Sequence, residues 1–116
     1  MQNKPATLVT DIQVAATDTT YYTVPANTRT TITSALVNNT TATPRTLTVN
    51  IIPNGGSLGA SNEVVTDLVI PAAGAAPTQL TALIGQTLLA AGQISMIADA
   101  ATALTVLISG YEVTIS

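Results

Sequence analysis

Apolar and polar residues alternate along most of this chain, which is the pattern of β-strands with one buried and one exposed face. The clearest example is residues 45–53, where Leu47, Val49 and Ile51 alternate with polar neighbours. The pattern then stops at the Asn-Gly-Gly sequence of residues 54–56, which is typical of a turn. The alternation therefore predicts strands rather than helices.

The same pattern recurs at spacings near ten residues, with glycine, proline and asparagine between the segments. The predicted segments are residues 7–14, 20–24, 29–38, 45–53, 63–70, 78–91, 93–99 and 102–116. We expect residues 29–38 and 45–53 to form an antiparallel pair, and the last two segments to form a final pair. Eight such strands predict an all-β fold, an antiparallel β-sandwich of the jelly-roll or immunoglobulin-like kind.

One segment, residues 78–91, fits two patterns. Leu80, Leu83 and Ile84 follow the spacing of a helical stripe. Leu80 and Ile84 also fit one side of a short strand. Gly85 in the middle favours a strand or turn with at most one helical turn.

Another segment, residues 63–70, is apolar on both faces. Val65 and Val69 lie on one face, opposite Val64 and Leu68. A strand in the centre of a sheet, or at an interface with another molecule, has this composition.

The last strand contains a glycine at which the alternation changes. Leu104 and Ile108 share one face, but the apolar set beyond Gly110 begins with Tyr111. Continued alternation would instead turn Gly110 and Glu112 inward. We therefore expect a β-bulge at Gly110 that brings Tyr111 to the inner face.

The whole chain, residues 1–116, is predicted to be one domain, with a flexible arm at residues 1–6. These first residues include Lys4 and Pro5 and no apolar run, so they do not resemble a signal peptide. We expect synthesis and folding in the cytoplasm. Residues 68–98 carry no charge, but Pro71 and three glutamines interrupt them, so a transmembrane helix is not expected.

Composition adds that the chain has little reactive chemistry. It contains 22 threonines and 18 alanines but no histidine or cysteine, and charged residues make up 8%. Most catalytic triads, most zinc sites and all thiol chemistry are thereby removed. We expect a protein that is not an enzyme, with no catalytic residue, no cofactor and no metal. The net charge of -3 also argues against nucleic acid and anionic membranes as partners.

The remaining candidates for chemistry are weak. Glu63 and Asp67 are four residues apart and share a strand face, where two solvated carboxylates are the plainer interpretation. No acidic loop has the pattern of a calcium site. The glycine-rich residues 53–61 lack the lysine of a phosphate-binding loop.

The low charge favours a protein that is buried in an assembly. Exposed edge strands are usually protected by charge or proline, and the predicted strands at residues 29–38 and 102–115 have few of either. We therefore expect a homo-oligomer. Arg29 and Arg45 are candidate interface anchors, although a surface pair with Glu63 or Asp67 is the alternative. The interface residues that we predict are Met1, Gln2, Asn3, Lys4, Pro5, Ala6, Arg29, Arg45, Val65 and Val69.

Three stretches carry a resemblance to a known group of proteins. They are YYTVPANTRTTITSALVNNTTATPRTLTVNIIPNGGS, EVVTDLVIPAAG and LLAAGQISMIADAATALTVLISGYEVT. Together they cover about residues 21–114, and their order of strands and turns resembles small β-sandwich structural proteins of tailed-phage virions. The resemblance extends over strand and turn patterns rather than a catalytic fingerprint.

This resemblance implies a location in the virion and virion proteins as partners. Such proteins include capsid decoration (cement) proteins, which typically form trimers over the junctions of the major capsid protein, and also head fibres, tail and baseplate components. The arm at residues 1–6 would then reach a neighbouring subunit. We favour decoration of the head. A carbohydrate- or surface-binding module on the same sandwich is the alternative.

Overall fold

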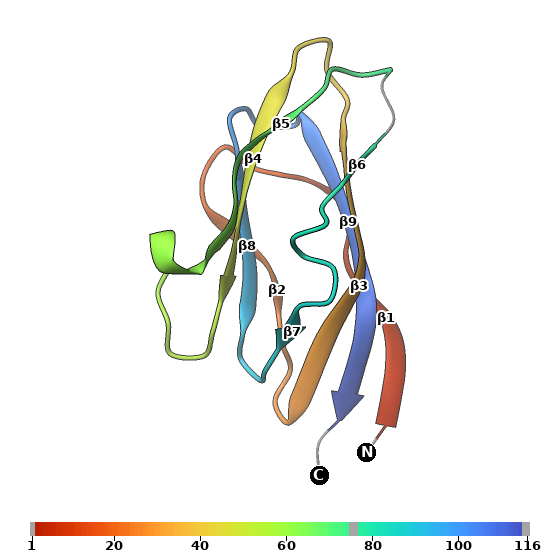
Figure 1. Cartoon of the computed structure of the whole chain (residues 1–116), viewed down its shortest axis with the longest axis vertical. Helices are drawn as coiled ribbons and strands as arrows, with labels where there is room; N and C mark the ends of the chain where they lie inside the picture. The colour runs from red at the N-terminus through yellow and green to blue at the C-terminus, as the bar shows by residue number, and fades with distance from the viewer. Residues whose placement is uncertain (1, 75–76, 115–116) are drawn as a thin grey trace.

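The computed structural model describes residues 2–74 and 77–114. Two antiparallel β-sheets pack face to face, with an elongated outline of 48 × 27 × 19 Å (Figure 1). This arrangement confirms the predicted all-β sandwich.

Each sheet combines strands that are distant in sequence. Sheet A has the order β1 (Gln2–Gln13), β9 (Leu104–Thr114), β3 (Thr28–Asn39) and β6 (Thr78–Gln79), and β7 (Thr87–Leu88) also pairs with β3. Sheet B has the order β2 (Thr19–Thr23), β8 (Gln93–Ala98), β4 (Arg45–Ile52) and β5 (Glu63–Ile70). A single 3-10 turn within the described residues, η1 (Ala60–Asn62), precedes β5.

The core lies between the two sheets and is made of the inward residues of the alternating strands. Leu47 and Val49 of β4 belong to this core together with Val106 and Ile108 of β9, and all four side chains are fully buried. Burial of such aliphatic side chains supplies most of the favourable free energy of folding. The predicted strand positions at residues 45–53 and 63–70 agree closely with β4 and β5.

The predicted pairing of strands is wrong in two places. β3 and β4 are not an antiparallel pair, because β3 belongs to sheet A and β4 to sheet B, and β8 and β9 are likewise in different sheets. Buried Asn39 helps to hold the crossing from β3. Its Nδ2 donates to the carbonyl oxygens of Thr43 (2.7 Å) and Ile70 (3.3 Å), and its Oδ1 accepts from the backbone N–H of Thr41 (2.9 Å).

The predicted unprotected edges are also wrong, because β9 lies between β1 and β3, and β3 is itself covered by β6 and β7. The outer strands include β1, which carries Lys4 and Pro5, and β5, which is an edge strand rather than a central one. β5 contains Asp67 at φ 44, where its register with β4 shifts. Charge, proline and bulges thus protect these edges.

The segment between β6 and β7 closes one side of the sandwich (Figure 1). It consists of turns, in agreement with the prediction of a strand or turn, and Gly85 has φ +89. Its backbone follows β3: the N–H of Gly85 donates to the oxygen of Ile32 (2.7 Å), and the N–H of Leu80 donates to the oxygen of Ala35 (2.9 Å). Leu80 and Leu83 are buried in the core.

Two details of sheet A correct the sequence analysis. The alternation of β9 continues through Gly110, which is buried, while Tyr111 is exposed. The extra residues lie in the neighbours of β9 instead: the register shifts between Ile32 and Ser34 of β3. A Cβ atom at Gly110 would overlap the backbone of Thr31, so only glycine allows this close pairing.

The predicted N-terminal arm is instead the first half of β1. Residues 2–6 pair with β9, from Gln2 opposite Thr114 to Ala6 opposite Gly110. Pro5 is compatible with this strand because β1 is an edge strand, where a residue without an N–H is tolerated. Met1 lies outside the described residues.

Candidate functional site

A groove of about 610 Å³ lies between the end of β4, the start of β5 and the β7 region. Its apolar lining includes Val64, Leu88 and Leu89, and the amide side chains of Asn54 and Gln86 also contribute. No residue in the lining carries a charge. The groove has the volume of a small-molecule site, but its lining residues offer only apolar contact and hydrogen bonds from uncharged amide and hydroxyl groups.

An asparagine network fixes the loop beside this groove. Asn50, which is buried, donates from Nδ2 to Oδ1 of Asn62 (2.7 Å) and to the oxygen of Gly59 (3.0 Å). Asn62 in turn donates to the oxygen of Ser57 (2.8 Å). The sequence patterns above do not predict this role, although an asparagine inside an apolar strand is a signal of a buried, hydrogen-bonded side chain.

A partly buried polar cluster joins the two sheets at one end of the sandwich. The hydroxyl of Tyr22 on β2 donates to Oε2 of Glu112 on β9 (2.7 Å) and lies 2.7 Å from Oγ1 of Thr30 on β3. Burial raises the pKa of Tyr22 to about 12, and the hydrogen bond and negative charge of Glu112 act in the same direction against an opposing Thr30 hydrogen bond. A tyrosine with so high a pKa stays protonated at neutral pH, so Tyr22 acts as a hydrogen-bond donor that links the two sheets and not as a base.

The raised pKa of hydrogen-bonded Tyr22 predicts a pH dependence of stability. Since the pKa of Tyr22 is about 12 in the folded chain and 10.0 in the reference state, the unfolded chain loses the proton first. The stabilisation is therefore complete below about pH 10 and is lost as the pH rises from about 10 to about 12. We expect the free energy of unfolding in urea to fall more steeply over this range in the wild type than in Tyr22→Phe. Equal slopes would contradict the prediction.

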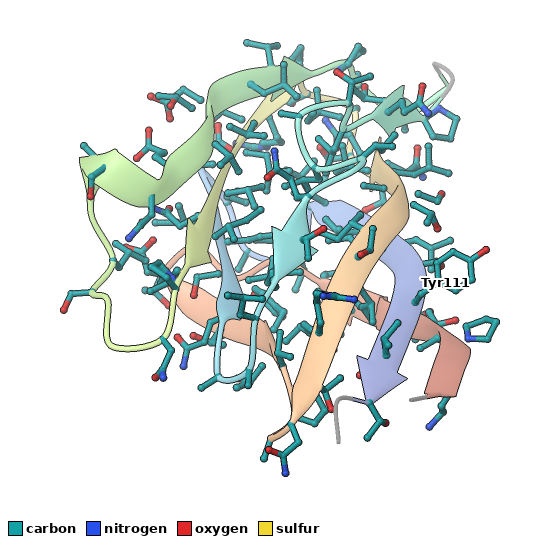
Figure 2. All side chains as sticks on the ribbon, turned by 60° about the horizontal axis from the view of Figure 1, so that its bottom comes forward. Tyr111 is labelled. Atoms are coloured by element: carbon teal, nitrogen blue, oxygen red, sulfur yellow. The ribbon has the colours of Figure 1, made fainter. Side chains whose placement is uncertain are left out.

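The outer face of sheet A is formed by the outward residues of the long strands β1, β3 and β9, and it carries Arg29 at one end. On β9, Leu107 and Tyr111 point outward and are 40% and 41% exposed. Figure 2 shows the ring of Tyr111 extending away from the sheet. Opposite these residues on β3 lie Leu36 and Thr31, respectively. Hydroxyl and small apolar groups dominate this face, which favours close contact with another surface rather than catalysis.

The predicted interface residues do not form one surface. Arg29 pairs with Val113 at one end of the outer face of sheet A. Val69 is 61% exposed on β5 of sheet B, whereas Val65 is 8% exposed in the core, so its assignment to an interface is wrong. The bulge at Asp67 explains this, because it changes which β5 residues face inward.

The remaining predicted residues are divided between two strands. Arg45 begins β4, where its Nη1 lies 4.0 Å from Oδ2 of Asp99, so its partner is neither Glu63 nor Asp67. Lys4 and Pro5 are exposed on β1, and Ala6 is half-buried. For Gln2 and Asn3 the structure describes the backbone pairing with β9.

The two carboxylates that share a predicted strand face do not form a site. Glu63 accepts a hydrogen bond from the Thr66 hydroxyl, and Oδ1 of Asp67 accepts one from Oγ1 of Thr48 (3.3 Å). Among the described residues there is no group of three or more acidic side chains suited to a metal ion. In the same part of the chain, no helix has the length and apolar character needed to span a membrane.

Comparisons of the chain with protein families, with curated proteins and with solved structures found no match. Function therefore has to be inferred from the fold and the surfaces of the chain itself.

Proposed function

We propose that this chain is a non-enzymatic structural protein of a tailed-phage virion, and specifically a capsid decoration protein that stabilises the head by bridging capsid subunits. The observation that carries the proposal is the outer face of sheet A, a broad surface of hydroxyl and apolar groups with Arg29 at one end. The resemblance of the sequence to virion structural proteins supports the same assignment.

The order of the strands favours a jelly roll over an immunoglobulin-like sandwich. β4 and β5 are consecutive neighbours in one sheet, but the connections that precede β2, β3, β4, β6, β8 and β9 all cross between sheets. Immunoglobulin domains have several consecutive strands paired in one sheet. Jelly rolls occur in viral capsid and lectin domains. The fold alone does not decide between these uses.

The proposed mechanism depends on buried area. Apolar surface removed from water contributes roughly 25 cal/mol per Å², and a standard protein interface buries about 1,600 Å². A surface with few charges can be buried without leaving an unpaired ion, which would be strongly destabilising. Many such contacts, repeated over a shell, would resist internal pressure without any single strong bond.

Two alternatives remain as proposals. A tail, baseplate or head-fibre component would make the same kind of low-charge contact with a different virion partner. A carbohydrate- or surface-binding module would use the groove beside β7, where the amides of Asn54 and Gln86 accompany apolar side chains. The groove lining contains no aromatic platform for a sugar, so this second alternative is weaker.

Mass spectrometry of purified virions of the phage that encodes the chain tests the proposal. We expect the chain in many copies per particle, in constant ratio to the major capsid protein, and retained on isolated heads. Recovery with isolated tails would favour the tail alternative. Absence from all particles, together with binding of the free chain to neutral oligosaccharides, would contradict the virion assignment.

A further inference from the structure

We propose that two copies of this chain pack through the outer face of sheet A around a two-fold axis at Ser109. The inference deepens the proposed function and rests on its assumption that the protein self-associates. It names the surface and the partner, which is a second copy. A two-fold contact closes at two copies, and thus differs from the trimer expected from the resemblance.

Spacing along β9 makes this face complementary to itself. Leu107 and Tyr111 are the large exposed hydrophobic residues of β9, and each lies two residues from Ser109. At a rise of about 3.3 Å per residue, each is roughly 7 Å from the proposed axis. A two-fold axis that lies parallel to the sheet surface above Ser109, perpendicular to β9, therefore places Tyr111 of one copy over Leu107 of the other, and the reverse.

The surface beside Tyr111 is hollowed in a way that suits this contact. A depression of about 360 Å³ is lined by Pro5, Thr7, Thr33, Ser109 and Tyr111, together with Ala6 and Gly110. It lies on the Tyr111 side of Ser109, because Pro5 is opposite Tyr111 and Thr7 is opposite Ser109. The rotation brings Leu107 of the second copy to this side. The hollow can therefore receive an aliphatic side chain.

Charge is compatible with the same arrangement. Arg29 pairs with Val113, four residues from Ser109, and Asn38 pairs with Thr105, four residues away in the other direction. The rotation places each Arg29 near the Asn38 end of the second copy, where an amide oxygen can accept from the guanidinium. The two Arg29 side chains themselves lie at opposite ends, so they do not repel each other at close range.

The area is sufficient for a specific pair. Strands of about eleven residues are roughly 36 Å long, and three to four strands spaced about 4.8 Å apart are roughly 14–19 Å wide. The face then measures about 500–700 Å² in projection, close to the roughly 800 Å² that each partner contributes to a standard interface. Together with its self-complementary pattern, this size favours a second copy over an unrelated partner.

Crosslinking of single-cysteine variants tests the axis directly, because the native chain contains no cysteine. In Ser109→Cys, the two thiols should face each other across the axis. Packed sheets lie about 10 Å apart, which is too far for a direct disulfide, so a short bis-maleimide reagent is the probe. We expect a covalent dimer of Ser109→Cys as the main product.

Two matched controls define the geometry. Val113→Cys lies on the same strand and face, but the two copies of residue 113 would be about 26 Å apart. Val69→Cys is exposed on sheet B, away from the proposed contact. Both should give several-fold less dimer. Tyr111→Ser, added to Ser109→Cys, should reduce the crosslinked fraction and the native mass measured by light scattering.

Equal crosslinking of all three cysteine variants, a monomeric wild type at high concentration, or a trimer would each overturn the proposed contact. These outcomes are independent of the virion experiment. A chain that is present in heads but not crosslinked at Ser109→Cys keeps its proposed function and loses this surface. A crosslinked chain that is absent from particles keeps the surface and loses the function.

Discussion

Replacing Gly110 by alanine is expected to destabilise the protein by about 3 kcal/mol or more, at the upper end of the range for overpacking a core. The new Cβ atom would overlap the carbonyl oxygen of Thr31 and lie 2.9 Å from its carbonyl carbon and 3.1 Å from Cα of Ile32. These are backbone atoms of the adjacent strand, which cannot rotate away as a flexible side chain would. β3 and β9 would have to separate locally.

Urea unfolding of the purified variant, followed by circular dichroism, measures this loss. Gly59→Ala is the matched control, because a Cβ there would have ordinary contact with the oxygen of Ser57 at 4.0 Å and the backbone is extended, with φ -175. We expect the control to change the free energy of unfolding by about 0.5 kcal/mol or less. Similar values for the two variants would show that Gly110 is not confined by β3.

Replacing Leu83 by alanine is expected to lower the free energy of unfolding by about 2–5 kcal/mol, the range for deleting a buried leucine side chain. Leu83 belongs to the turn segment between β6 and β7 and is fully buried. Its backbone N–H donates to the oxygen of Leu80 (3.0 Å), which shapes the turn. Truncation would leave a cavity between the sheets at the side that this segment closes.

Leu89→Ala is the control for this second prediction. Leu89 is close in sequence but 65% exposed, so its truncation removes little buried surface, and we expect a change within about 0.5 kcal/mol. Thermal unfolding and urea unfolding should both show Leu83→Ala to be less stable than Leu89→Ala. A small effect at Leu83 would mean that the segment is a surface loop and not part of the core.

The register of β9 connects stability to the proposed function. Because the alternation continues through Gly110, Glu112 turns inward to accept a hydrogen bond from Tyr22, and Tyr111 turns outward. The bulge predicted from the sequence would bury Tyr111 instead. The exposed aromatic ring that anchors the proposed two-copy contact thus exists because a glycine allows β3 and β9 to pair closely.

The candidate site could be anticipated only in part. The scarcity of charge and the abundance of threonine are visible in the sequence, and they predict a contact surface rather than a catalytic centre. The particular face could not be found in this way. Val65 and Val69 both suggest an interface by their spacing, but the bulge at Asp67 leaves one in the core and the other exposed.

Local pattern in the sequence was enough to locate most strands, including β5 at Glu63–Ile70, because alternation and turn residues act over a few neighbouring positions. Only the tertiary structure decided which strands pair. The crossing from β3 to β4 depends on the contact of Asn39 with Ile70, 31 residues away, and the outward position of Tyr111 depends on the contact of Gly110 with Thr31. Such long-range contacts leave little trace in local periodicity, since each forms only when strands that are distant in sequence come together.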